Sequence, residues 1–140
     1  MDGARLYYCP LASRRLYSVA TDVLADRSRD DGVVAATVIN EGDRSGASDG
    51  LELDSAGYIY STNYEHNAIL RRRAGSGWET VVHDPRLLWL DTLSLVTDGY
   101  LYITANQLHR QPSYHQGQDL RHKLYTLFRV RIDAQPVLLR

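Results

Sequence analysis

The feature that most constrains the fold of this chain is a stretch of fifteen residues that occurs twice. Residues 48–62 align without a gap with residues 90–104, which begin 42 positions later (90 − 48 = 42). The seven identical pairs are Asp49/Asp91, Leu51/Leu93, Leu53/Leu95, Gly57/Gly99, Tyr58/Tyr100, Tyr60/Tyr102 and Thr62/Thr104. A repeat of about 40 residues is the length of one four-stranded blade of a β-propeller. The sequence therefore predicts an array of blades, and we expect its function where the blades converge.

The apolar residues between the turns follow the pattern of strands. They alternate or form short runs, and no stretch keeps the 3.6-residue period of a long helix. We expect one short helix at residues 21–29, and a long polar loop at residues 106–123, which is typical of a functional or mobile segment. The expected strands, about eleven, are residues 5–9, 15–19, 33–40, 51–54, 58–63, 67–73, 78–83, 92–96, 100–105, 125–132 and 136–140. The predicted fold class is all-β, a partial β-propeller.

The repeat divides the chain into about two and a half to three four-stranded blades of a single β-propeller fragment, residues 1–140. Blade 1 is expected at residues 1–47 without its inner strand, blade 2 at residues 48–84 and blade 3 at residues 85–140. A propeller protects its sheet edges by closing into a ring, commonly of about 4 to 8 blades. The chain is therefore expected either to be a truncated fragment of a larger protein or to pair with a second copy as a homodimer that completes a six-bladed ring.

Charge and composition exclude several classes of partner. Sixteen basic and seventeen acidic side chains leave a net charge of −1, which gives no electrostatic reason to expect nucleic acid or an anionic membrane as partner. The longest apolar run is far below the roughly 20 residues of a membrane span, and no signal peptide is visible. Cys9 is the only cysteine, so no intrachain disulfide can form, and we expect it to be a packing or loop residue.

Two repeated carboxylates are the main candidate site. Asp49 and Asp91 precede the inner strand of successive blades, so they should be neighbours around one rim of the central channel. Two converging carboxylates can bind a divalent cation, and oxygen ligands favour Ca²⁺, Mg²⁺ or Mn²⁺. The alternative is that each aspartate caps backbone amides of its turn, a structural role.

Four more residues are candidates for ligand contact. Asn63 and Asn106 follow the second strand of their blades, and Glu65 and His66 lie in the short polar loop after Asn63. Their side-chain oxygens and amides could bind a ligand at one face of the propeller. Asparagine in such a place is also a common turn residue, so a structural role is the competing interpretation.

The long loop and one aromatic residue near the start of blade 3 carry weaker signals. His109, His115 and His122 fall in or beside this loop, but their spacing matches no zinc pattern, and we expect exposed loop residues. Trp89 is predicted to pack between blades. No nucleophile elbow of the GxSxG type is present, which argues against Ser-His-Asp catalysis.

Three segments together resemble the major royal jelly protein / yellow family. They read SDGLELDSAGYIYSTNYEHNAI, DPRLLWLDTLSLVTDGYLYITANQLHRQP and LYTLFRVRI. The resemblance runs through essentially the whole chain and implies the C-terminal half of a six-bladed propeller. By the same resemblance, the protein is expected to bind a small organic ligand in the central channel and to be extracellular or periplasmic.

The chain also resembles, more distantly, the gluconolactonase / senescence-marker-protein family, which shares the six-bladed architecture. That family has a metal-binding and catalytic aspartate in a similar SDG context, which implies Asp49 as catalytic residue and metal ligand. The implied alternative function is a metal-dependent hydrolase of sugar lactones or esters. The family's other ligands, a glutamate and asparagines, belong to blades that this chain lacks or does not clearly match, so its full metal site is not expected here.

Overall fold

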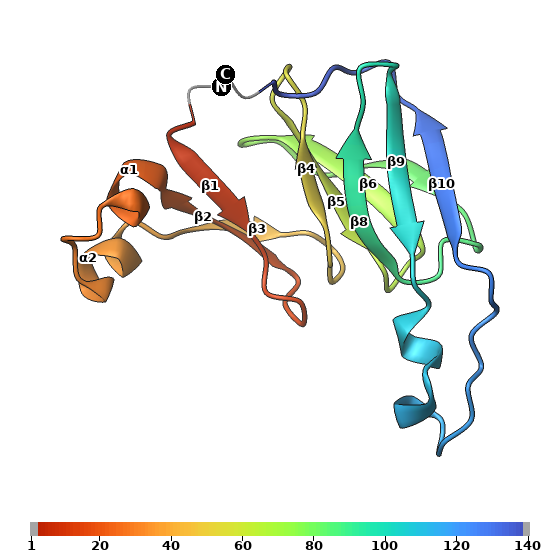
Figure 1. The fold of residues 1–140 in the computed structure, drawn as a ribbon. Coiled ribbons are helices and arrows are strands. Elements are labelled where there is room, and N and C mark those ends of the chain that lie inside the picture. Colours follow the sequence, from red (N-terminus) through yellow and green to blue (C-terminus); the bar gives the residue numbers. More distant parts are fainter. Residues whose placement is uncertain (1–2, 139–140) are drawn as a thin grey trace.

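Residues 3–138 of the chain are described by a computed structural model, in which they form ten strands and two short α-helices. The strands make three antiparallel sheets, and Figure 1 shows these sheets fanned side by side, with the second between the first and the third. In each sheet the strands follow one another in sequence order, as in the blades of a propeller. The predicted fold class, an all-β partial β-propeller, is confirmed.

The first sheet has three strands in the order β1-β2-β3. The strands are β1 (Arg5–Tyr8), β2 (Arg15–Ala20) and β3 (Ile39–Asp43), and helices α1 (Thr21–Ala25) and α2 (Asp31–Ala36) connect β2 to β3. Both helices lie at the far side of this sheet, away from the other two (Figure 1). They therefore leave the side toward the second sheet free for packing.

The strand expected at residues 33–40 is wrong in its first part. Residues Asp31–Ala36 form helix α2, and the strand begins only at Ile39. The side chain of Asp30 accepts a hydrogen bond from the Val33 amide (2.9 Å), which caps the first turn, and the alanines in this segment favour a helix. The helix expected at residues 21–29 is correct in type but ends at Ala25.

The second sheet is a complete four-stranded blade. Its strands are β4 (Leu51–Leu53), β5 (Tyr58–Asn63), β6 (Ala68–Arg73) and β7 (Glu79–His83), and each pairs with the next. Successive residues of β6 alternate between its two faces. Arg71 and Arg73 pack on the ring of Tyr58, whereas Arg72 donates to the Glu41 carbonyl of the first sheet (2.9 Å). The three arginines therefore do not form one basic surface.

The third sheet contains β8 (Leu90–Leu95), β9 (Tyr100–Ala105) and β10 (Thr126–Arg131). Two single-turn 3₁₀ helices, η1 (Leu108–Arg110) and η2 (Pro112–Tyr114), occupy the long loop between β9 and β10. This loop extends beyond the end of the sheet in Figure 1.

Of the strand expected at residues 136–140, the described part, residues 136–138, does not join the third sheet. Pro136 instead makes an isolated antiparallel bridge with Asp54 of the second sheet, and the Gln135 carbonyl accepts from the Ser55 amide (2.8 Å). Proline has no backbone donor for a ladder, which explains why no regular strand forms here. Residues 139 and 140 lie outside the described part of the chain.

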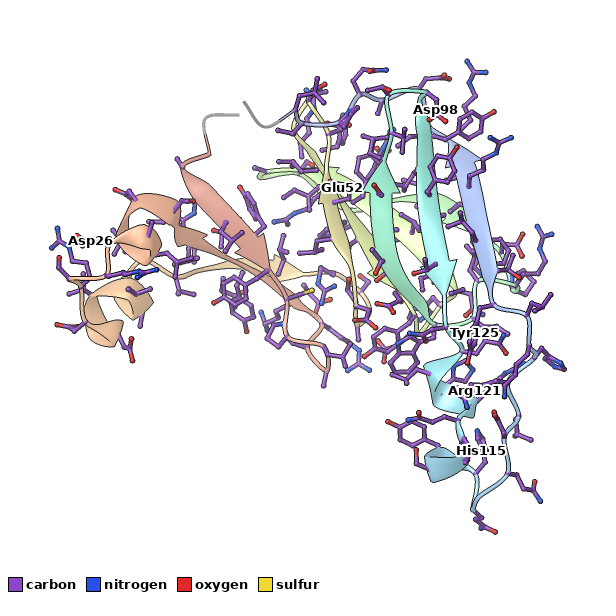
Figure 2. All side chains as sticks on the ribbon, viewed as in Figure 1. Asp26, Glu52, Asp98, His115, Arg121 and Tyr125 are labelled. Atoms are coloured by element: carbon purple, nitrogen blue, oxygen red, sulfur yellow. The ribbon has the colours of Figure 1, made fainter. Side chains whose placement is uncertain are left out.

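The apolar core lies between the second and third sheets. Its fully buried members are Tyr60, Ile69, Leu87, Leu90, Leu93, Leu95, Leu101 and Ile103. The inner strands β4 and β8 run side by side, and the Glu52 carboxylate of β4 accepts a hydrogen bond from the Leu95 amide of β8 (3.2 Å). Figure 2 labels Glu52 on β4, next to the third sheet. This hydrogen bond links the two inner strands, whose first residues follow the segments described next.

Candidate functional site

All six predicted site residues lie at one end of the second and third sheets. Asp49 lies just before β4 and Asp91 is the second residue of β8, whereas Asn63 ends β5 and Glu65, His66 and Asn106 lie in the loops that follow β5 and β9. This is the end from which the long loop extends in Figure 1, and Figure 2 shows the turn with Asp98 at the opposite end. Loops at one end of a propeller surround the mouth of its channel, so the placement agrees with a shared site.

Asp49 is oriented by hydrogen bonds to its side chain and its backbone. The indole Nε1 of Trp89 donates to Asp49 Oδ2 (2.9 Å). The amides of Asp49 and Gly50 both donate to Thr62 Oγ1 (3.0 Å each). One carboxylate oxygen is thus positioned by an indole from the next sheet, while the backbone before β4 is anchored to β5.

A buried polar network supports this turn from behind. Arg44 is 0% exposed and donates to Ser61 Oγ (3.1 Å), and Ser61 Oγ contacts Ser48 Oγ (3.0 Å). Ser48 in turn lies 3.2 Å from the same Thr62 hydroxyl that holds Asp49. Burial lowers the pKa of Arg44, and the Arg44 Nε finds no hydrogen-bond partner among residues 3–138. Such a network stabilises one geometry, because every displaced member leaves a buried polar group unpaired.

Asp91 is held by the loop that follows β9. Asn106 Nδ2 donates to Asp91 Oδ2 (2.9 Å), and Asn106 Oδ1 accepts from the amide of Leu108 at the start of η1 (2.9 Å). The backbone after Asp49 also meets the backbone of Asp91 at the start of β8. A Cβ on Gly50 would lie 2.2 Å from the carbonyl oxygen of Asp91, so only glycine allows this approach. The structure therefore places Asn106 on the Asp91 carboxylate and the segment after Asp49 against the Asp91 carbonyl.

Trp89 forms the centre of an aromatic stack that spans the two sheets. Tyr64, after β5, stacks on the indole at 4.1 Å between ring centroids, and His109, in η1, lies at 6.0 Å on an almost parallel plane. Trp89 itself has a left-handed backbone conformation, with φ 55°. A bulky residue rarely adopts this conformation, and such outliers are concentrated at functional sites. The predicted packing of Trp89 between blades is observed, whereas Tyr64 was not predicted as part of the site.

The remaining candidates are engaged in contacts with the connection that leads into blade 2. Asn63 Nδ2 donates to the Ser45 carbonyl (3.3 Å), and Asn63 Oδ1 pairs with His66 Nδ1 (3.0 Å). Glu65 accepts from the Ala47 amide (2.8 Å) and from Arg14 Nε (3.0 Å). The Ala47 bond, followed by the Arg14 bond, lowers the pKa of Glu65. These three residues thus hold the first and second sheets together, at a place separate from Asp91 and Asn106.

The described residues supply only part of a metal site. Asp49 and Asp91 offer oxygen donors of the kind that Ca²⁺ prefers, but a calcium ion takes about six to eight oxygens. Within residues 3–138 no group of three or more His, Cys, Asp or Glu side chains is close enough to hold a metal ion. A cation bound by the two aspartates would need further ligands from outside this part of the chain.

Among residues 3–138, no helix is long and apolar enough to cross a membrane.

Three fanned antiparallel sheets with adjacent inner strands define the chain as part of a β-propeller protein. Similar solved structures include a gluconolactonase from Xanthomonas campestris (TM-score 0.65, 18% identity, 96% of this chain and 42% of that chain). Another is a luciferin-regenerating enzyme (TM-score 0.64, 13% identity, 96% of this chain and 43% of that chain). Identities this low show a shared fold alone, and the chain spans less than half the length of either structure. No curated protein sequence matches it at a significant level.

The sequence profile of the major royal jelly protein family matches residues 1–135. The chain belongs to the major royal jelly protein family.

Proposed function

We propose that this chain forms part of a propeller that binds a small organic ligand at the mouth of its channel, beside Asp91 and Asn106. The observation that carries the proposal is a hollow of about 340 Å³. It is lined by both of these residues and by Tyr125 and Leu127. Small-molecule sites combine apolar walls with a few well-placed polar groups, and this hollow has both. Tyr125, labelled in Figure 2, comes from the chain just before β10.

The positions of the two aspartates support the same proposal. Each carboxylate has a defined orientation, Asp49 through Trp89 and Asp91 through Asn106. A carboxylate has about four lone-pair sites, so each retains acceptor capacity for a ligand hydroxyl or amine. Pre-oriented acceptors lower the entropic cost of binding. The other part of the ring, contributed by further residues or by a second copy of the chain as a homodimer, would complete the channel.

A second candidate function is a metal-dependent hydrolase acting on sugar lactones or esters. The fold shared with a gluconolactonase and the fixed position of Asp49 favour it. Asp49 would act as metal ligand and catalytic residue, and Asp91 as a second ligand of a divalent cation such as Ca²⁺. The cation would polarise the carbonyl or activate water. Because two carboxylates do not complete a calcium site, the hydrolase requires ligands from the rest of the ring.

One set of variants tests both functions. Asp49→Asn and Asp91→Asn remove the negative charges, and Asp22→Asn is the matched control because Asp22 is exposed and far along the chain in α1. The intrinsic tryptophan fluorescence, which comes from Trp78 and Trp89, is followed while monosaccharides, phenols or glucono-1,5-lactone are added, with and without Ca²⁺. We expect one compound class to change the signal, with affinity at least about tenfold weaker in both site variants and unchanged in the control.

Three outcomes decide between the functions. Binding without turnover supports the ligand-binding function. Hydrolysis of the lactone that is lost in EDTA and in Asp49→Asn supports the hydrolase. Equal affinities in all three variants would contradict both proposals.

A further inference from the structure

The long loop between β9 and β10 is folded on itself. Gln107 is only 8% exposed, and its side chain makes a reciprocal pair with the backbone of His122. Gln107 Nε2 donates to the His122 carbonyl and Gln107 Oε1 accepts from the His122 amide, both at 2.9 Å. Further along, the Leu120 amide donates to the Arg110 carbonyl (3.0 Å). These bonds join the outgoing and returning arms, so the loop has the construction of a compact Ω-loop, a class that is frequently functional.

A cavity of about 690 Å³ opens between the two arms of this loop. That volume lies within the range of small-molecule sites, about 300–1,000 Å³. Its lining comes entirely from the loop: His109, Arg110, His115, Asp119, Leu120, Arg121 and His122. Figure 2 shows His115 and Arg121 within this loop, away from the sheets. The lining therefore combines one apolar side chain, Leu120, with three imidazoles, two guanidinium groups and the carboxylate of Asp119.

The charge of the cavity favours an anion. Arg121 donates to both carboxylate oxygens of Asp119, through Nε (2.8 Å) and Nη2 (2.9 Å), and Lys123 lies 3.6 Å from the same group. The Arg121 hydrogen bonds hold the pKa of Asp119 far below its usual range, so this carboxyl remains ionised and already neutralised. The guanidinium of Arg110 makes no hydrogen bond or ion pair with any of residues 3–138. One cation in the lining is thus left without a counter-charge.

The imidazoles add hydrogen-bonding groups and join the cavity to the aromatic stack. His115 Nε2 pairs with the His109 carbonyl (2.9 Å), which fixes the ring of His115 at the wall. His109 stacks on Trp89 on its other side. Burial, together with Arg110 and His115, lowers the pKa of His109, which favours the neutral ring as a hydrogen-bonding group.

We propose that this loop cavity binds a small organic anion, a carboxylate or a phosphate monoester, through Arg110, with the carbon skeleton against Leu120. A guanidinium presents parallel N–H donors that match the oxygens of either group. This inference does not depend on the ligand proposed for the channel mouth, because the two sites share no lining residue.

The test uses the full 140-residue chain and three probes built on one sugar skeleton. Glucose 6-phosphate supplies a phosphate monoester, gluconate a carboxylate, and glucose is the neutral comparison. Binding is measured by calorimetry for the wild type, for Arg110→Gln and for Arg27→Gln. Arg27 is exposed, and the control loses the same charge outside the loop. Because the Arg110 side chain has no partner to lose, its variant is expected to fold normally, which thermal unfolding checks.

We expect at least one anion to bind and glucose not to bind. Arg110→Gln should weaken the affinity at least about tenfold, whereas Arg27→Gln should leave it within about twofold. Ring resonances of His109 and His115 should shift on addition of the binding anion and stay in place with glucose. The relative affinities of the phosphate and carboxylate probes identify the preferred anion. Binding of glucose as tight as that of the anions, no anion binding at millimolar concentration, or equal weakening by both variants would overturn the proposal.

Discussion

The hairpins β4–β5 and β8–β9 are two copies of one sequence, yet they pack against their preceding sheets with opposite chemistry. Ser48 and Ser61 of the second sheet correspond to Leu90 and Ile103 of the third. All four are buried. The serines bond to each other and to the buried Arg44, whereas the leucine and isoleucine belong to the apolar core. The same interface between neighbouring blades is thus built once from hydroxyls around a cation and once from hydrocarbon.

The two interfaces therefore contribute differently. Buried hydrocarbon stabilises by the hydrophobic effect, at roughly 25 cal/mol per Å². A buried polar network contributes little net stability, but it specifies one arrangement of its members. In the second sheet that arrangement includes the turn of Asp49, which the network holds through Thr62. The comparison indicates that part of the buried surface of the second sheet positions the turn of Asp49.

Both hairpins contain a hydrogen bond from a tyrosine hydroxyl to an aspartate carboxylate. Tyr60 donates its hydroxyl to Asp54 (3.0 Å), and Tyr102 donates to Asp98 (2.9 Å). The tyrosines are equivalent, but Asp98 corresponds to residue 56 (98 − 42 = 56), two positions after Asp54. Both carboxylates also accept from the amide at the start of the second strand. Both copies therefore have the same tyrosine–aspartate hydrogen bond, although the aspartate occupies a different position in the turn.

The largest loss of stability is expected when a hydroxyl side chain replaces a buried hydrocarbon at the interface between the second and third sheets. Ile103→Ser should destabilise the protein by about 3–5 kcal/mol, because it creates a cavity and buries a hydroxyl among hydrocarbon. Urea denaturation followed by circular dichroism measures the change. Ile39→Ser is the control, because Ile39 is 48% exposed, and it should cost less than about 1 kcal/mol. Equal losses would show that the interface between the second and third sheets is not the main source of stability.

An intermediate effect is expected from the matched threonines. Thr62→Val removes a buried acceptor of two amide hydrogen bonds and should cost about 1–3 kcal/mol. Among residues 3–138, Thr104 accepts only from the Thr92 amide (3.1 Å), and it is exposed, so Thr104→Val should stay within about 0.5 kcal/mol. The same denaturation experiment compares the two variants. A larger loss in Thr104→Val would reverse the proposed difference between the sheets.

The smallest effect is a change in the pH dependence of stability. Glu65 and Gln107 are equivalent positions (107 − 42 = 65), but only the glutamate titrates. Because its bonds to Ala47 and Arg14 lower the pKa of Glu65 in the folded state, its contribution is present above the unfolded pKa of about 4.3. That contribution is lost as the pH falls through the lower folded value.

Glu65→Gln should therefore flatten the decline of the urea midpoint between about pH 5 and pH 3. Asp22→Asn is the control. An unchanged profile in Glu65→Gln would mean that this bridge between the first and second sheets contributes nothing to stability.

Much of the fold could be predicted from the sequence because the repeat carries local signals. Gly57 and Gly99 adopt positive φ values, as turns of this kind require, and the strands around them alternate as expected. The wrong strand predictions lie in segments outside the repeat. Helix α2 begins after a capping aspartate, Asp30, and Pro136, after β10, forms a bridge with Asp54 next to the second sheet. In the sequence alone, neither the capping aspartate nor the proline is a stronger signal than the apolar pattern, which predicts a strand in both segments.

The candidate site was predictable in part. Asp49 and Asp91 were identified from their equivalent places in the repeat and Asn106 from its place after a second strand, and the structure pairs Asn106 with Asp91 and packs Gly50 against the Asp91 carbonyl. The role of Arg44 could not be predicted, because one arginine in a polar segment has no period that would mark it as buried. The Trp89–Asp49 bond joins residues 40 positions apart, and nothing local to either residue indicates it.

The sequence by itself determined the repeated unit: antiparallel strands, a tight glycine turn in each hairpin, and an aspartate at or just before the start of β4 and β8. These are local properties, because strand periodicity and turn geometry act between residues that are close along the chain. The tertiary structure alone decided which side chains face each other across neighbouring blades. That choice made one interface polar and the other apolar, and it placed the cationic loop cavity next to the aromatic stack. Burial and electrostatic pairing depend on distances in space, which residue order does not specify.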